Sequence, residues 1–277
     1  MRPVSRGICL AVLAALLMPV AAGAGRIPAP DNLLAESLDL PQQSEQPGVA
    51  DLLWQAGYKH PGGQFHVLVH FPQGLSERVD MEVAAFAKAQ FDETNAVFLS
   101  MAADMAAEAQ SVLSAALLKK SVFPPEEEFR WSAPYFSVVN YQVHRSSARY
   151  ASIHFMGSEY TGGAHGNRFH IVLSFDLTTG VRLAFDDLFA DKDAGLPRLV
   201  SRIADGVQEL KVVGTEPVLR DPASIDATME RIALTSEGLR VVYAPYEMGS
   251  YAEGEFIVDI PREELVKMGI RADFWKN

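Results

Sequence analysis

Two segments rich in tyrosine, glycine and acidic residues carry the side chains best suited to contact a ligand. The first, YTGGAHG, spans residues 160–166 between two strand-like stretches, and the second spans residues 245–255. Consecutive glycines permit positive φ, so the first segment is either a tight structural loop or a recognition loop. Tyrosine among small and acidic residues suits contact with protein or sugar, and a solvated hairpin connection explains the second segment equally well. The candidate ligand-binding residues are therefore Tyr160, Gly162, Gly163, His165, Gly166, Tyr246, Glu247 and Tyr251.

Histidines around the first segment raise the alternative of a metal site. His154, His165 and His170 lie on or between neighbouring predicted strands, with Glu159 nearby. Three such ligands could hold zinc with a water in the fourth position, as in a metal-dependent hydrolase. The sequence has no HExxH, and none of the spacings places the ligands on one helix or turn. We therefore expect no catalytic residue, no metal and no cofactor, and keep a His165-centred hydrolase of envelope glycan as the alternative.

Composition and charge limit the class of partner. Of the 277 residues, 48% are hydrophobic and 21% are charged, which is typical of a globular protein. The formal net charge is −11 at pH 7, and no run of lysine or arginine appears. Nucleic-acid binders usually carry a basic face, so we expect no nucleic-acid partner. An acidic surface favours cationic partners instead.

The N-terminal residues predict export. Arg2 and Arg6 precede an apolar stretch at residues 8–20, and the small residues 22–24 form a cleavage site, so residues 1–24 are expected to be a signal peptide. Cleavage would change the net charge to −13 and remove Cys9, the only cysteine, which lies outside a lipoprotein box. No later stretch is apolar for long enough to span a bilayer. We expect a periplasmic or secreted protein without a membrane span after cleavage.

The hydrophobic pattern predicts an α+β fold. Residues 52–59 and 64–71 flank a Pro-Gly-Gly turn and are expected to form a hairpin. Residues 76–120 predict one or two long helices with Ser76 as N-cap, and residues 196–210 predict a shorter amphipathic helix. Alternation then predicts strands at 135–144, 149–156, 168–177, 181–184, 232–235, 239–244 and 255–260, and a short helix from Arg262. We expect an antiparallel β-sheet of successive hairpins packed with one or two long helices and a second, shorter helix.

Three segments together resemble the DUF3298 family. They are YTGGAHG, the stretch FDLTTG at 175–180 that leads into LAFDDLF, and the C-terminal stretch from Glu237 to Pro261. The strand, proline and long helix upstream are similar to a DUF4163 segment. With the signal peptide and a flexible leader at 25–50, this predicts a DUF4163-like segment at 51–156 and a DUF3298-like segment at 157–277.

The resemblance implies an envelope binding module rather than an enzyme. The family includes the extracellular domain of the lysozyme-sensing anti-sigma factor RsiV and the accessory domain of the peptidoglycan deacetylase PdaC. This sequence shows neither a sigma-binding segment before a membrane span nor a deacetylase domain, so neither activity is carried over. The implied partners are a cationic lysozyme-like protein or peptidoglycan fragments, contacted by the loops at 158–167 and 245–255.

Overall fold

The computed structural model describes residues 48–60, 63–119, 135–211 and 228–276. The predicted signal peptide and almost all of the predicted leader lie outside the described residues. Among the described helices, none combines the length and the hydropathy needed to cross a membrane.

A hairpin opens the described chain. β1 (Ala50–His60) and β2 (Gly63–Gln73) pair antiparallel, with Ala50 opposite Gln73 and His60 opposite Gly63. The prediction for this segment is confirmed.

One long helix follows, α2 (Glu77–Lys119), with 43 residues. The carbonyl of Ser76 accepts the N–H of Asp80 at 2.8 Å, as expected at an N-cap, but the Ser76 hydroxyl has no hydrogen-bond partner. The carboxylate of Asp80 instead accepts the N–H groups of Gly74 and Leu75, each at 3.0 Å. The side-chain cap predicted for Ser76 is thus replaced by an acidic residue in the first turn that holds the incoming chain.

The larger sheet has six strands in the order β1-β2-β3-β4-β5-β6. The remaining strands are β3 (Tyr135–Arg145), β4 (Tyr150–Tyr160), β5 (Asn167–Asp176) and β6 (Val181–Arg182). All neighbours pair antiparallel except β2 and β3, which pair parallel, with Phe65 opposite Tyr135. The expectation of a wholly antiparallel sheet is therefore wrong at one pair. The connection from β2 to β3 contains α2, and a crossover of this kind lets two strands run in the same direction.

A second, three-stranded sheet was not expected as a separate unit. It contains β7 (Ile232–Leu234), β8 (Gly238–Tyr243) and β9 (Phe256–Pro261). The helices α3 (Lys192–Leu210) and α4 (Arg262–Met268) pack against it. Short 3₁₀ turns complete this part: η2 (Phe185–Leu188), η3 (Met229–Arg231), η4 (Tyr251–Glu253) and η5 (Ala272–Trp275).

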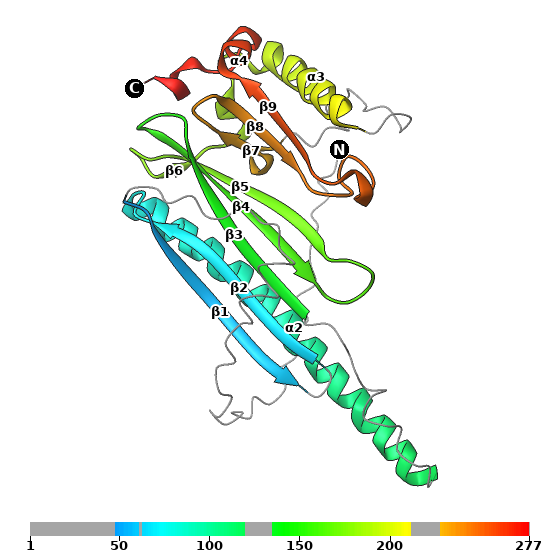
Figure 1. Ribbon diagram of the computed structural model, residues 1–277. Coiled ribbons are helices and arrows are strands. Elements are labelled where there is room, and N and C mark those ends of the chain that lie inside the picture. Colours follow the sequence, from blue (N-terminus) through cyan, green and yellow to red (C-terminus); the bar gives the residue numbers. More distant parts are fainter. Residues whose placement is uncertain (1–47, 61–62, 120–134, 212–227, 277) are drawn as a thin grey trace, which may run out of the picture.

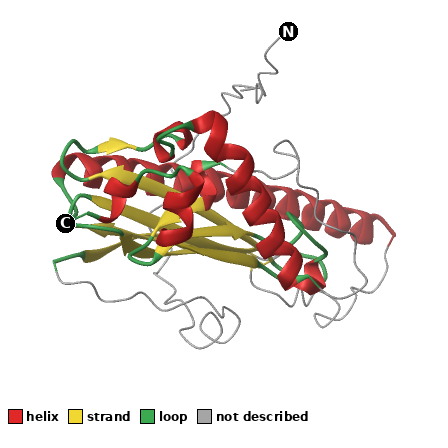
Figure 2. Cartoon of the chain, turned by 90° about the horizontal axis from the view of Figure 1, so that it is seen from above, coloured by secondary structure: helices red, strands yellow, loops and turns green. Residues whose placement is uncertain are grey.

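The elements form layers around two apolar cores. α2 covers one face of the larger sheet, and the smaller sheet lies over the other face with α3 and α4 outermost (Figures 1 and 2). The first core lies between α2 and the larger sheet and includes Phe65, Val83 and Phe155. The second lies between the smaller sheet and α3 and includes Leu199 and Val241. β4 runs without a break through residues 156 and 157, so the predicted segment boundary falls inside a strand.

A chain of buried serine hydroxyls joins the two sheets. The Leu234 N–H donates to Ser152 Oγ at 2.8 Å, Ser152 Oγ lies 2.6 Å from Ser174 Oγ, and Ser174 Oγ donates to the Ile232 carbonyl at 3.4 Å. A carbonyl oxygen only accepts, so the Ser174 hydroxyl points to Ile232 and the Ser152 hydroxyl must point to Ser174. The backbone of β7 is thereby satisfied by side chains of β4 and β5 in place of a neighbouring strand.

Candidate functional site

The two predicted recognition loops meet, although about 80 residues separate them. The first connects β4 with β5, and the second connects β8 with β9 in the other sheet. His165 and Tyr251 stack with ring centroids 3.8 Å apart and an interplanar angle of 17°. The Tyr246 hydroxyl lies 3.1 Å from His165 Nε2, and its ring lies 5.5 Å from that of Tyr251. We call His165, Tyr246 and Tyr251 the aromatic cluster.

The hydrogen bonds of His165 identify the tautomer of its neutral form. Its Nδ1 lies 3.0 Å from the carbonyl oxygen of Gly166, and because that oxygen only accepts, Nδ1 carries the hydrogen. Nε2 is then free to accept from the Tyr246 hydroxyl. Both ring nitrogens are thus engaged by the loops themselves, which fixes the plane on which Tyr251 stacks.

The backbone at Tyr246 is strained. Its φ is +73°, and it is the one non-glycine residue with positive φ in the part of the chain that the structure describes. A bulky residue in this region costs on the order of 1–3 kcal/mol and persists where the surroundings or function require it. The side chain is nevertheless 60% exposed. The strained backbone therefore presents the Tyr246 ring to solvent and does not bury it in a core.

The other five predicted residues build the loops. The Tyr160 hydroxyl donates to the Gly163 carbonyl at 3.0 Å, and its ring stacks beside Tyr135 and Phe136. Gly162 and Gly163 have φ of +104° and +100°, which favours glycine at both positions. A Cβ at Gly166 would lie 2.9 Å from the Glu159 carbonyl oxygen.

Glu247 has the same kind of role at the second loop. It accepts from Arg231 Nη1 and from the backbone N–H of Ala244, both at 2.6 Å. These contacts fix the start of the loop.

The histidines considered as metal ligands are divided between two places. His154 Nε2 lies 2.9 Å from His170 Nδ1 on adjacent strands, whereas His165 belongs to the aromatic cluster. Within the described ranges, no group of three or more histidine, cysteine, aspartate or glutamate side chains is placed to hold a metal ion.

A row of three histidines, with His154 buried and His144 and His170 partly buried, crosses the larger sheet on the side that faces the smaller one. His144 on β3 stacks beside His154 on β4, with centroids 6.2 Å apart, and His154 contacts His170 on β5. At the far end, Glu255 Oε1 lies 3.6 Å from His170 Nε2 and 3.1 Å from Arg168 Nη1. We call His144, His154 and His170 the histidine row.

Burial controls protonation in this row. It lowers the pKa of His154 to about 3, with further lowering from the neighbouring His170 and His144. Burial and then the charge of Arg240 lower the pKa of His144 to about 4. Contact with His170, and then with Arg168, lowers the pKa of Glu255 to about 2. His144 and His154 are therefore neutral, and Glu255 is charged, at neutral pH.

Comparison with known proteins identifies the C-terminal part. Residues 186–263 match the model of the DUF3298 family, a protein family of unknown function. The predicted resemblance to DUF3298 is confirmed over this segment, which runs from η2 into α4 and includes the second loop with Tyr246 and Tyr251. The first loop lies outside the matched DUF3298 segment.

The chain is also similar to solved structures of DUF3298 proteins. A member from Bacteroides fragilis NCTC 9343 has a TM-score of 0.54 at 17% identity and covers 80% of this chain and 94% of its own. A second, from Pseudomonas aeruginosa PAO1, has a TM-score of 0.45 at 15% identity and covers 83% and 97%. No curated protein matches the chain. The likeness to the first structure shows a shared fold and nothing about a ligand.

Three residues of the histidine row and its charged end were not identified from the sequence. They are His144, Arg168 and Glu255. His144 and His154 are two residues out of register across the β3–β4 pair, where His154 faces Gln142 and His144 faces Ser152. Each of the three predicted strands contains one histidine, and that recurrence was the available signal. The position of Glu255 depends on how the two sheets pack, which no local pattern reveals.

Proposed function

We propose that this protein is an exported, non-catalytic binding module of the bacterial cell envelope that recognises its ligand through the aromatic cluster. The observation that carries the proposal is the meeting of two loops from different sheets to stack His165 on Tyr251 and bond it to Tyr246. Loops on a rigid scaffold are common recognition sites, and aromatic rings supply contact area at a low entropy cost. The predicted signal peptide supports the location.

The proposed ligand is a cationic lysozyme-like protein or a peptidoglycan fragment. The formal net charge of −11 favours association with a cationic protein. The exposed ring of Tyr246 also suits the apolar face of a sugar ring. The two ligands come from the resemblance to DUF3298 that the sequence motifs imply, because that family includes a lysozyme-sensing anti-sigma factor and the accessory domain of a peptidoglycan deacetylase.

The hydrolase alternative receives no support from a specific contact. His165 uses both ring nitrogens within its loops, and His154 and His170 hydrogen-bond to each other. We therefore do not extend the proposal to catalysis.

The test is isothermal titration of the chain from Gly25 against a c-type lysozyme at two salt concentrations, followed by muropeptides. We expect saturable one-to-one binding to one of them that survives moderate salt. Tyr251→Ala should weaken it by about thirtyfold, the effect of a central aromatic contact worth ~2 kcal/mol. Met81→Ala removes an exposed apolar side chain from α2 and is the matched control.

The outcomes separate the ligands. Heat that disappears at the higher salt means attraction between net charges only and removes lysozyme as a specific partner. Binding to muropeptides alone assigns the fragment. Absence of saturable binding to both, or equal affinity of Tyr251→Ala and Met81→Ala, would sink the proposal.

A further inference from the structure

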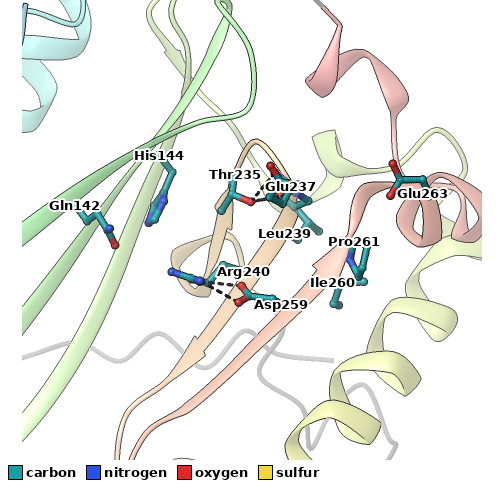
Figure 3. Close-up of a pocket in the computed structure, with 11 residues that line it drawn as sticks. Gln142, His144, Thr235, Glu237, Leu239, Arg240, Asp259, Ile260, Pro261 and Glu263 are labelled. Atoms are coloured by element: carbon teal, nitrogen blue, oxygen red, sulfur yellow. Dashed lines mark hydrogen bonds and ion pairs between the residues drawn. The ribbon is translucent and has the colours of Figure 1, made fainter. Parts of the chain in front are cut away.

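A cleft opens between the two sheets, lined by residues separate from the aromatic cluster. Its volume is about 410 Å³, within the roughly 300–1,000 Å³ typical of small-molecule sites. β3 forms one wall, and β8, β9 and the turn between β7 and β8 form the other (Figure 3). The walls come from both sheets, so the cleft exists only when the two pack together.

An ion pair forms the polar part of one wall. Arg240 on β8 donates through Nε to Asp259 Oδ1 at 2.8 Å and through Nη2 to Asp259 Oδ2 at 2.9 Å. The two residues face each other directly in the β8–β9 register. Arg240 Nη1 has no hydrogen-bond partner among the described residues. The pair is electrically neutral and presents one spare donor group to the cleft.

The opposite wall presents two polar groups from one face of β3. Figure 3 shows Gln142 and His144, two residues apart, pointing into the space that the Arg240 guanidinium also enters. The His144 residue lines the cleft with its Nε2 atom closed off from solvent, whereas the Gln142 amide makes no hydrogen bond to any other described residue.

The charges at the edge of the cleft restrict what fits. Glu237 and Glu263 line it together with Asp259, which disfavours an anion near Arg240. Asp259 is neutralised by Arg240 and Glu263 by Arg262, which reduces the attraction of the cleft for a cation. The groups left over are the donor Arg240 Nη1 and the Gln142 amide, which both donates and accepts.

We propose that this cleft binds a neutral secondary amide, as carried by an N-acetylated amino sugar or by a short peptide. The ligand carbonyl would accept from Arg240 Nη1, and the ligand N–H would donate to the side-chain oxygen of Gln142, beside the His144 ring. The inference does not depend on recognition by the aromatic cluster, because no residue of that cluster lines the cleft.

The experiment follows the His144 ring by ¹⁵N NMR in the full-length protein. The probes are the N-acetylglucosamine dimer and N-acetylalanine N-methylamide, and the glucosamine dimer, which lacks the acetyl groups, is the control. We expect a saturable shift of the His144 signals with an amide probe and none with the glucosamine dimer. A response to the sugar alone assigns an acetamido group, and a response to the peptide alone assigns a peptide bond.

Variants separate this cleft from the other site. Gln142→Met should weaken binding of the active probe about threefold to tenfold, the loss expected for one hydrogen bond. Gln73→Met, on the exposed end of β2, and Tyr251→Ala should leave it unchanged. Thermal unfolding checks that Gln142→Met folds, and the probe series on the unmodified protein does not depend on it. The proposal is overturned if neither amide probe shifts His144, or if Gln142→Met and Gln73→Met bind equally.

Discussion

The two faces of the larger sheet are built from different side chains. The face toward α2 is apolar, with aromatic and β-branched residues such as Phe65, Val143 and Phe155. The face toward the smaller sheet contains the serine hydroxyl chain and the histidine row, with Val172 in a small apolar contact to Ala233 and Val242. The first face stabilises the fold in proportion to the apolar area that it buries. The second face joins the two sheets through directional hydrogen bonds and borders the cleft.

The largest effect should come from the apolar face. Phe155 is fully buried and packs against Phe86 and Tyr141, with ring centroids 4.9 and 6.4 Å away. Phe155→Ala should lower the free energy of unfolding by about 3–5 kcal/mol, because it removes a ring and leaves a cavity. Urea unfolding at constant m-value measures this. A loss below about 1.5 kcal/mol would mean that this face does not carry the stability.

The polar face should make stability fall in mild acid. The folded pKa values of His144 and His154, about 4 and about 3, lie below the unfolded value of 6.5, so the unfolded chain binds more protons as the pH falls. The contribution of these two neutral histidines to the free energy of unfolding is fully present above about pH 7.5. It falls as the pH drops below about 6.5, and the loss is about 2 kcal/mol for each histidine at pH 5. The contribution of Glu255 is lost only as the pH falls from 4.5 toward about 2.

Urea unfolding at pH 7.5 and pH 5 measures this difference. The matched variant is His154→Gln, which cannot gain the proton and should show a smaller loss between the two pH values. Equal losses for the variant and the unmodified protein would assign the acid sensitivity to groups outside the histidine row.

The serine hydroxyl chain should contribute less. Ser152→Ala leaves the N–H of Leu234 without its partner and should cost about 1–3 kcal/mol, the desolvation of one buried group. Ser158→Ala, on the same strand and face and without a side-chain hydrogen bond among the described residues, should change stability by less than about 0.5 kcal/mol. Similar unfolding energies for the two variants would show that the hydroxyl chain does not join the sheets.

The smallest effect on stability is expected at the aromatic cluster. Tyr246→Asn places a residue that tolerates φ of +73° at this exposed position, so the free energy of unfolding should change by less than about 1 kcal/mol in either direction. Binding of the ligand identified by titration should nevertheless be lost. A variant that is strongly destabilised would mean that Tyr246 has a packing role.

Local sequence patterns predicted the helices and strands but not which strands pair with each other. The alternation at Phe65, Val67 and Val69 and the helical spacing over 76–120 predicted β2 and α2 because they record which side chains are buried. The parallel β2–β3 pair could not be read in this way, since periodicity does not encode strand direction. The predicted helix at 196–210 is confirmed but begins earlier, at Lys192, where the Asp191 side chain accepts the N–H of Ala194.

The same limit holds for the candidate site: the sequence identified residues of the right type but not the contacts between them. Residue type identified His165, Tyr246 and Tyr251, and the structure brings them together. Their contact with one another depends on two hairpins from different sheets, so it was not predictable from either segment. The cleft was missed for the same reason: Arg240 and Asp259 look like ordinary exposed strand residues until β8 is set opposite β9 and β3.

The parallel β2–β3 pair also has a consequence for the order of folding. The β1–β2, β3–β4 and β4–β5 hairpins and α2 involve contacts that are close in the sequence and can form within microseconds. Pairing of Phe65 with Tyr135 must instead close a loop of about 70 residues. Contacts of high sequence separation slow folding, so this pairing should be rate-limiting. Until it forms, both β2 and β3 expose an unpaired edge, and the chain is then most prone to aggregate.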